Sequence, residues 1–140
     1  MEETNEYLCG PRMLKAYLDK VTGPKLEELR LTPSSAPFLG EIAQNEGASL
    51  KLLSELLMVD KAHTTRVISK LIDSGLVENR AEGHEYSLYL TETGIVAWKR
   101  SKIIMEEAWE DLLKDLTPEE RKTLRGILEK IARVVREAEQ

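Results

Sequence analysis

The sequence predicts a mostly helical α+β protein in which one β-hairpin interrupts a series of helices, and three observations support this prediction. Apolar residues recur at helical spacing through most of the chain. Residues 76–80 and 86–90 have the composition of two short strands around the tight loop 81–85. The segments before this hairpin form a helix, a tight turn and a second helix. Helix, turn, helix and hairpin in that order predict a winged helix-turn-helix, which presents one helix to the major groove of DNA.

The predicted order of elements is two helices, a minor strand, two helices, the two strands of the hairpin and two final helices. We expect an N-terminal helical arm over residues 1–31, the winged helix-turn-helix domain over 32–93 and a C-terminal helical region over 94–140. The two outer regions are expected to pair two copies of the chain. Charged residues make up 32% of the chain and hydrophobic residues 41%, which is typical of a soluble protein. No apolar run approaches the ~20 residues of a membrane span. The acidic start lacks the pattern of a signal peptide, and there is a single cysteine, so we predict a cytoplasmic protein with no membrane contact.

The first two helices are predicted from their start signals and apolar stripes. Gly10-Pro11 suits the start of the first helix. Proline lacks an amide hydrogen and clashes with the preceding turn, so we expect Gly23-Pro24 to interrupt this helix and residues 25–30 to continue it with a kink. Thr32-Pro33 starts the second helix, and residues 47–49 can form a minor strand against the hairpin. The apolar residues of these two helices are Leu14, Tyr17, Leu18, Val21, Phe38, Leu39, Ile42 and Ala43.

The helix-turn-helix begins at Ser49 and turns at Met58-Val59-Asp60. Asp60 is placed to cap the second helix by accepting a hydrogen bond from an amide of its first turn. Ser74-Gly75 ends that helix, because glycine adopts a left-handed turn without strain. The first helix carries Leu52, Leu53, Leu56 and Leu57 on one face. The second is expected to bury Val67, Ile68, Leu71 and Ile72 and to leave Lys61, His63, Thr64, Thr65, Arg66 and Lys70 for its outer faces.

The two C-terminal helices are predicted to have long apolar seams. Thr91 is placed to cap the first, whose seam residues recur at alternating steps of three and four, a heptad pattern with one polar member. Thr117-Pro118-Glu119-Glu120 has the sequence of a capping box that starts the second. A helix with so long a row of apolar residues on one face needs a partner surface to cover it. Packing within the monomer would supply one, but we favour the pairing of two copies. The seam comprises Ile95, Trp98, Lys102, Met105, Trp109, Leu112 and Leu116, and the stripe of the last helix comprises Leu124, Ile127, Leu128, Ile131, Val134, Val135 and Ala138.

Several short motifs follow one another along most of the chain: Leu31-Thr32-Pro33, Ser54-Glu55-Leu56-Leu57, Val59-Asp60-Lys61, Thr65-Arg66-Val67, Gly75-Leu76-Val77-Glu78 and Leu90-Thr91-Glu92-x-Gly94. In this order the set resembles the MarR (multiple antibiotic resistance regulator) family of transcription factors. The resemblance implies a homodimer that binds double-stranded DNA at a pseudo-palindromic operator, represses transcription and is released by a small amphipathic or phenolic effector. The effector crevice of the family would here be bordered by parts of residues 14–21, 38–42 and 95–98.

The same resemblance assigns the candidate DNA-binding residues. The base- and phosphate-contacting positions of the family fall on Lys61, Ala62, His63, Thr64, Thr65 and Arg66. Lys70 on the same helix, and Arg80 and His84 in the hairpin, are the further bases expected to contact DNA. Arg66 can donate two hydrogen bonds to a guanine or a phosphate, and the threonines can hydrogen-bond to phosphates or contact thymine methyl groups. A solvated helix face without a partner is the alternative interpretation, but the position between a tight turn and a hairpin favours DNA.

The hairpin loop departs from the family pattern. The family loop is longer and carries Asp-x-Arg, and these positions fall here on Glu82 and His84. Since arginine suits the narrow minor groove better than histidine, we predict a weak or pH-dependent contact of this loop with DNA. The net charge is −5, and residues 34–91 contain eight acids and five bases, whereas residues 61–70 contain three bases and no acid. The excess of acids in residues 34–91 and the acidic loop of the hairpin favour one alternative function. This alternative is a winged-helix protein-interaction module that has lost sequence-specific DNA binding.

Cys9 raises a second alternative, a redox-sensing regulator, because one branch of the family senses organic hydroperoxides through an N-terminal cysteine. Arg12 and Thr22 stand where that branch has tyrosines, and no basic cluster surrounds Cys9, so we prefer to interpret it as an incidental thiol. The sequence contains no phosphate-binding glycine loop, nucleophile elbow or plausible catalytic triad. Two histidines and one cysteine offer no metal-ligand spacing. We therefore predict a protein that is not an enzyme and uses no cofactor and no metal.

Overall fold

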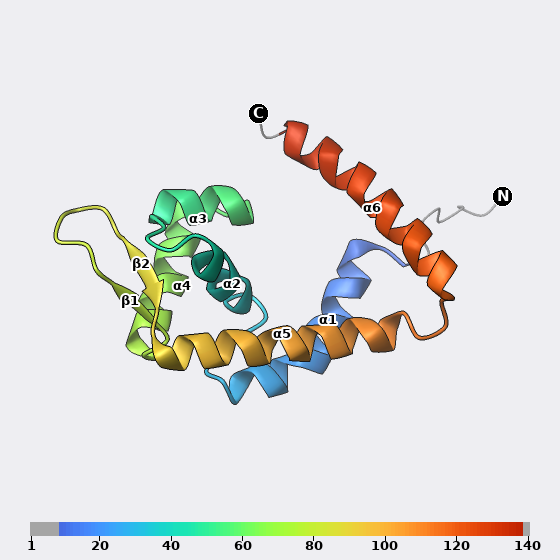
Figure 1. Cartoon of the computed structure of the whole chain (residues 1–140), viewed down its shortest axis with the longest axis horizontal. Helices are drawn as coiled ribbons and strands as arrows, with labels where there is room; N and C mark the ends of the chain where they lie inside the picture. The colour runs from blue at the N-terminus through green and yellow to red at the C-terminus, as the bar shows by residue number, and fades with distance from the viewer. Residues whose placement is uncertain (1–8, 139–140) are drawn as a thin grey trace. The chain divides into compact units, whose positions relative to one another are not determined.

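The computed structural model of the chain describes residues 9–138, which divide between two compact units, residues 9–105 and 106–138 (Figure 1). The elements are α1 (Pro11–Glu27), α2 (Ala36–Gln44), α3 (Leu50–Leu57), α4 (Lys61–Asp73), β1 (Val77–Asn79), β2 (Leu88–Leu90), α5 (Glu92–Leu112) and α6 (Pro118–Ala138). This order confirms the predicted fold class, a mostly helical chain with one antiparallel hairpin after the helix-turn-helix.

The core of the first unit lies among α2, α3, α4 and the hairpin, which pack together in Figure 1. Phe38, Leu39 and Ile42 on α2 are buried, as predicted, in the same cluster as Leu53 of α3 and Ile68 of α4. Full burial of one such side chain contributes about 1.5–3 kcal/mol. The apolar face of α4 is therefore held by several such contacts, which leaves the opposite face of this helix free to point outward.

Two apolar positions of the helix-turn-helix are more exposed than the sequence pattern predicts. Leu56 of α3 is 44% exposed, and Ile72 of α4 is only half-buried. Both residues lie in the last turn of their helices, where fewer neighbours remain to cover a side chain. The predicted burial of Leu53, Val67, Ile68 and Leu71 is confirmed.

The helix α1 passes through Gly23-Pro24 without interruption, so the predicted break at this pair is wrong. Thr22 and Leu26, on either side of Pro24, are both buried, and the Thr22 hydroxyl donates to the carbonyl of Leu18 at 2.7 Å. This packing holds the helical backbone in place of the hydrogen bond that proline cannot donate. The helix ends at Glu27 instead of continuing to Arg30, whose positive φ of 63° turns the chain back toward the core.

The second helix begins later than the sequence predicts, at Ala36 instead of at Thr32-Pro33. Thr32 and Ser35 close a turn by exchanging hydrogen bonds: the Thr32 amide donates to Ser35 Oγ at 2.9 Å, and the Ser35 amide donates to Thr32 Oγ1 at 3.0 Å. These side chains satisfy backbone groups that an earlier helix would otherwise use. Residues 32–35 consequently form a corner that leads into α2.

Side-chain caps fix the starts of α3 and α4, and the cap predicted at Asp60 is confirmed. Ser49 Oγ accepts from the Leu52 amide at 3.1 Å, and Asp60 Oδ1 accepts from the His63 amide at 2.7 Å. Met58 has a positive φ of 57°, and Gly75, after α4, has a φ of 77°. The two caps therefore define where α3 and α4 start, and the two left-handed positions define where they end.

The hairpin pairs Val77 with Leu90 and Asn79 with Leu88, so each strand is shorter than predicted. The Asn79 side chain accepts from the amides of Ala81 at 3.1 Å and Ser87 at 2.9 Å, which replaces ladder bonds at the base of the loop. The predicted minor strand is a single bridge, in which the Leu88 amide donates to the carbonyl of Ala48 at 3.0 Å. Figure 1 shows the loop between β1 and β2 extending away from the helices.

The N-terminal half of α5 belongs to the first unit and packs there through small residues and through Trp98 of the predicted seam. Gly94, Ala97 and Ser101 are buried, whereas Ile95 is 40% exposed. A Cβ on Gly94 would lie 1.9 Å from the carbonyl oxygen of Leu76, so only glycine permits this close approach. The predicted Thr91 cap is confirmed, because Thr91 Oγ1 accepts from the Gly94 amide at 2.9 Å.

The second unit consists of the end of α5 and α6. The predicted capping box is confirmed by bonds from the Thr117 amide to Glu120 Oε1 at 2.9 Å and from the Glu120 amide to Thr117 Oγ1 at 3.1 Å. The large apolar side chains of α6 are between 43% and 66% exposed at Ile127, Leu128, Ile131, Val134 and Val135. Within residues 9–138, no helix is both long and apolar enough to span a bilayer.

Candidate nucleic-acid interface

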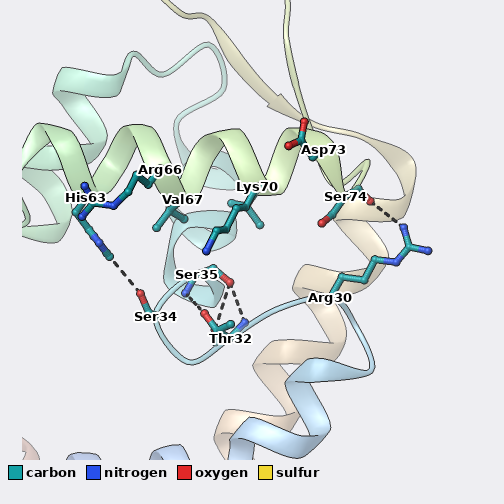
Figure 2. Close-up of a pocket in the computed structure, with 11 residues that line it drawn as sticks. Arg30, Thr32, Ser34, Ser35, His63, Arg66, Val67, Lys70, Asp73 and Ser74 are labelled. Carbon is teal, nitrogen blue, oxygen red and sulfur yellow. Dashed lines mark hydrogen bonds between the residues drawn. The ribbon is translucent and has the colours of Figure 1, made fainter.

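The exposed face of α4 carries most of the predicted DNA-binding residues. Lys61, Ala62, Arg66 and Lys70 are exposed, and Thr65 is half-buried, with its hydroxyl donating to the carbonyl of Lys61 at 2.9 Å. Arg66 and Lys70 are four residues apart, so their side chains lie on the same side of the helix, as Figure 2 shows. Among the described residues, no ion pair engages Lys61, Arg66 or Lys70. Three unpaired cations are therefore presented by one helix.

Thr64 does not lie on this outer face, and the prediction that placed it there is wrong. It is 0% exposed, and its Oγ1 accepts from Ser54 Oγ at 2.8 Å and donates to the carbonyl of Asp60 at 3.0 Å. The residue is three and four positions before Val67 and Ile68, which puts it on the buried stripe. Thr64 therefore joins α3 to α4, and the spacing to those apolar residues was the sequence signal for it.

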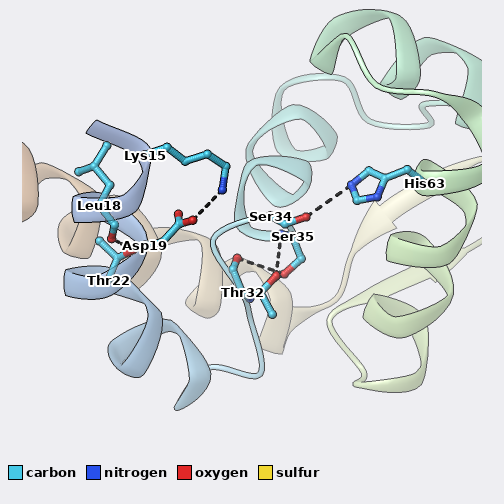
Figure 3. A network of polar contacts seen from close by, with 8 residues as sticks. All are labelled: Lys15, Leu18, Asp19, Thr22, Thr32, Ser34, Ser35 and His63. Carbon is cyan, nitrogen blue, oxygen red and sulfur yellow. Dashed lines mark hydrogen bonds and ion pairs between the residues drawn. The ribbon is translucent and has the colours of Figure 1, made fainter. Parts of the chain in front are cut away.

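His63 is half-buried and contacts the segment before α2. Its Nε2 lies 3.4 Å from Ser34 Oγ, and its ring packs against that of Phe38 with 6.1 Å between the ring centres. Figure 3 shows this contact beside the reciprocal bonds of Thr32 and Ser35. The first turn of α4 is thereby connected to the corner formed by residues 32–35.

A pocket of about 380 Å³ lies between α4 and this corner (Figure 2). Arg30, Arg66 and Lys70 bring positive charge to it, Ser34 brings a hydroxyl, and Asp73 is its one carboxylate. The Arg30 guanidinium donates to the carbonyl of Ser74 at 3.3 Å, which keeps it at the far end of the pocket. The excess of cations suits an anion of the size of a phosphate group. The lining residues are Arg30, Thr32, Ser34, Ser35, His63, Arg66, Val67, Lys70, Leu71, Asp73 and Ser74.

Arg30 and Ser34 were not among the candidate residues predicted from the sequence. They precede α2 and approach α4 only because the positive φ of Arg30 and the Thr32–Ser35 turn fold this segment back. Arg30 and Ser74, for example, are 44 residues apart in the sequence. A pattern of local spacing carries no signal for such an approach.

The hairpin loop presents its charges differently. The Arg80 guanidinium is bonded to the carboxylate of Glu78 at 2.7 Å and lies 4.0 Å from the centre of the Tyr89 ring. His84 is exposed in the loop, as are Glu82 and Glu85. Two bases of the hairpin were predicted to contact DNA. Of these, Arg80 is already paired with Glu78, and His84 has two glutamates close to it in the chain.

Two other predicted features lie outside this interface. Cys9 is an exposed free thiol just before α1. Trp98, a predicted border of the effector crevice, is half-buried, and its Nε1 lies 3.5 Å from the point where a Cβ on Gly40 would be. Across residues 9–138 no group of three His, Cys, Asp or Glu side chains is arranged to hold a metal ion.

Known sequences and structures resemble this chain along most of its length. The sequence model of the MarR family matches residues 31–85. The HTH-type transcriptional regulator YybA of Bacillus subtilis is 25% identical over 91% of this chain and 87% of its own. The regulator BilQ of Clostridioides difficile is 32% identical over 66% of this chain and 63% of its own, so the chain spans less than two thirds of that relative.

Solved structures give the same result for the fold. A MarR transcriptional regulator from Methanosarcina mazei has a TM-score of 0.83, with 28% identity over 90% of this chain and 91% of that chain. MepR of S. aureus in complex with DNA has a TM-score of 0.76, with 20% identity over 94% and 99%. The MarR family protein Rv2887 of Mycobacterium tuberculosis, in complex with salicylic acid, has a TM-score of 0.70, with 26% identity over 93% and 97%.

Proposed function

The chain belongs to the MarR family of transcriptional regulators, and from this premise we propose that it represses transcription by binding a pseudo-palindromic operator as a homodimer. The exposed basic face of α4 is the observation that carries the proposal. Lys61, Arg66 and Lys70 are exposed on this helix without a carboxylate partner among the described residues. A helix of this kind enters the major groove, where arginine reads guanine and lysine neutralises phosphates. The pocket beside Arg66 and Lys70 is suited to a phosphate of the flanking backbone.

The apolar stripe of α6 supports the homodimer. Five of its large apolar side chains are at least 43% exposed, and water contact over such a surface is unfavourable. Pairing with the same helix of a second copy would cover the stripe in both chains at once. The two α4 helices of such a dimer would enter successive major grooves about one helical turn, ~34 Å, apart.

A small effector is the proposed release signal. The relative from M. tuberculosis was solved with salicylic acid, which belongs to the class of phenolic anions that we propose for this chain. An effector that prefers the dimer with another spacing of its two α4 helices would shift the population away from the DNA-binding form. The crevice proposed for this effector would be bordered by parts of residues 14–21, 38–42 and 95–98.

Selection of DNA duplexes from a random pool at low salt tests this proposal. We expect an enriched inverted repeat, and we expect Arg66→Ala to weaken binding to it by about 1–3 kcal/mol. Lys99→Ala is the matched control, because it removes one exposed charge from α5, away from α4, and is expected to leave the affinity nearly unchanged. Failure to enrich any motif, or an equal loss in both variants, would reject the proposal.

The charges of the hairpin favour the second candidate function, a winged-helix protein-interaction module. Glu78 holds Arg80, and Glu82 and Glu85 are exposed in the loop, so this part of the surface is acidic. Such a module would show no specific DNA binding for Arg66→Ala to reduce. The same selection experiment therefore distinguishes the two functions.

A further inference from the structure

The outer face of the hairpin places three side chains next to one another. Successive residues of a strand point to opposite faces, so Glu78 and Arg80 lie on the face opposite the buried Val77. The register pairs Glu78 with Tyr89 on the neighbouring strand. Directly opposed and diagonal residues of an antiparallel pair are within reach of each other. The fold therefore brings a carboxylate, a guanidinium and an aromatic ring together at the base of the loop.

The contacts among these side chains are specific. Nε and Nη2 of Arg80 each lie 2.7 Å from Oε1 of Glu78, and the guanidinium carbon lies 4.0 Å from the centre of the Tyr89 ring. We propose that Glu78 acts as an internal substitute for a DNA phosphate: it holds Arg80 in the free protein and is exchanged for a backbone phosphate when the hairpin reaches DNA. Glu78 is then a residue that limits DNA affinity. This inference depends on the proposed DNA-binding function.

The exchange requires little rearrangement of the protein. The Arg80 side chain is 55% exposed and that of Glu78 46%, and water weakens the attraction between two charges so exposed. A guanidinium that stacks on a tyrosine ring keeps several N–H groups available for an incoming oxyanion. Tyr89 can therefore keep Arg80 oriented while the carboxylate leaves.

The backbone beneath these side chains is held independently of the ion pair. The Arg80 amide donates to the carbonyl of Ser87 at 2.9 Å, and Asn79 Oδ1 accepts from the amides on both sides of the loop. Loss of the Glu78 carboxylate should consequently leave the hairpin folded. A substitution of Glu78 can then report on DNA affinity without a change in structure.

Titration of the selected duplex with four proteins, the wild type, Glu78→Gln, Arg80→Gln and the double variant, tests the exchange. We expect Glu78→Gln to tighten binding by about threefold to fivefold, because no exposed ion pair then has to be broken before Arg80 reaches a phosphate. With Arg80 already replaced, Glu78→Gln should change the affinity by less than about twofold, because no guanidinium is released. Thermal unfolding of each variant checks that the fold is retained.

Glu82→Gln, made with and without Arg80→Gln, is the matched control for charge alone. It removes the same charge from an exposed loop residue, so its effect should be equal in the two backgrounds. An unchanged affinity for Glu78→Gln, or a gain that persists without Arg80, would overturn the exchange while leaving the DNA-binding function intact. If no duplex binds any of the proteins, the proposed function fails and this inference fails with it.

Discussion

The two parts of the chain predicted to touch DNA, the helix α4 and the hairpin loop, differ in how their charges are held. On α4, Lys61, Arg66 and Lys70 are exposed, and residues 61–70 contain no carboxylate. In the hairpin, Arg80 is bonded to Glu78, and two further carboxylates are exposed in the loop. Because salt screens charges beyond a Debye length of roughly 8 Å, a phosphate responds to these local arrangements rather than to the net charge of the chain. We therefore expect α4 to supply most of the affinity.

The two regions also differ in how firmly they are anchored. The buried face of α4 comprises Thr64, Val67, Ile68 and Leu71. The hairpin has strands of three residues, and its loop depends on the side chain of Asn79 for two of its hydrogen bonds. A rigid helix can hold its side chains in a geometry that matches base edges, whereas a loop that contacts the backbone tolerates more movement. We therefore expect α4 to read the DNA sequence and the hairpin to make weak contacts with the DNA backbone.

The largest effect in this comparison is expected from the anchor of α4. Ile68→Ala removes a fully buried side chain and should lower the free energy of unfolding by about 2–5 kcal/mol, measured by chemical denaturation. Ile72→Ala on the same helix is the control. Because Ile72 is only half-buried, this substitution should lower the free energy of unfolding by less. Equal losses in the two variants would contradict the anchoring of α4 by one buried face.

A smaller effect is expected at Thr64, which separates the buried face of α4 from its outer face. Thr64→Val keeps the shape but removes the hydroxyl that accepts from Ser54, so it should destabilise the fold by about 1–2 kcal/mol. Affinity for the selected duplex, measured where both proteins are folded, should change by less than about twofold, since a buried side chain touches no base. Thr65→Val is the control on the outer side. A large loss of DNA affinity in Thr64→Val with no loss of stability would show that Thr64 faces the groove.

The sequence predicts what depends on local spacing, and the structure adds what depends on distant contacts. The caps at Asp60, Thr91 and Thr117 were predicted correctly because each involves residues within one turn. The break at Pro24 was wrong because burial of the residues around it outweighs the lost backbone bond. Local preferences of about 1–3 kcal/mol are decisive only where tertiary packing does not oppose them.

The candidate interface likewise contains residues that the sequence predicted and residues that only the structure showed. The exposed cations of α4 were found from its amphipathic pattern and the family resemblance, whereas Arg30 and Ser34 come from the segment before α2 and reach the pocket through the tertiary fold. The pairing of Arg80 with Glu78 could not be predicted either, because it needs the register that places both residues and Tyr89 on one face. The sequence thus identified the helix that presents charge, while the structure identified which charges are already engaged.

The smallest effect is expected at the tip of the hairpin loop, where a substitution tests most directly how the loop and α4 differ in DNA contact. His84 is exposed and has Glu82 and Glu85 as neighbours in the chain, so His84→Ala should weaken DNA binding by no more than about twofold at pH 8. Fluorescence anisotropy with the selected duplex measures the difference, and Lys70→Ala is the reference on α4. Equal affinity of His84→Ala and the wild type would mean that the loop tip does not touch DNA, and the contact would then belong to α4, the corner beside it and Arg80 at the base of the loop.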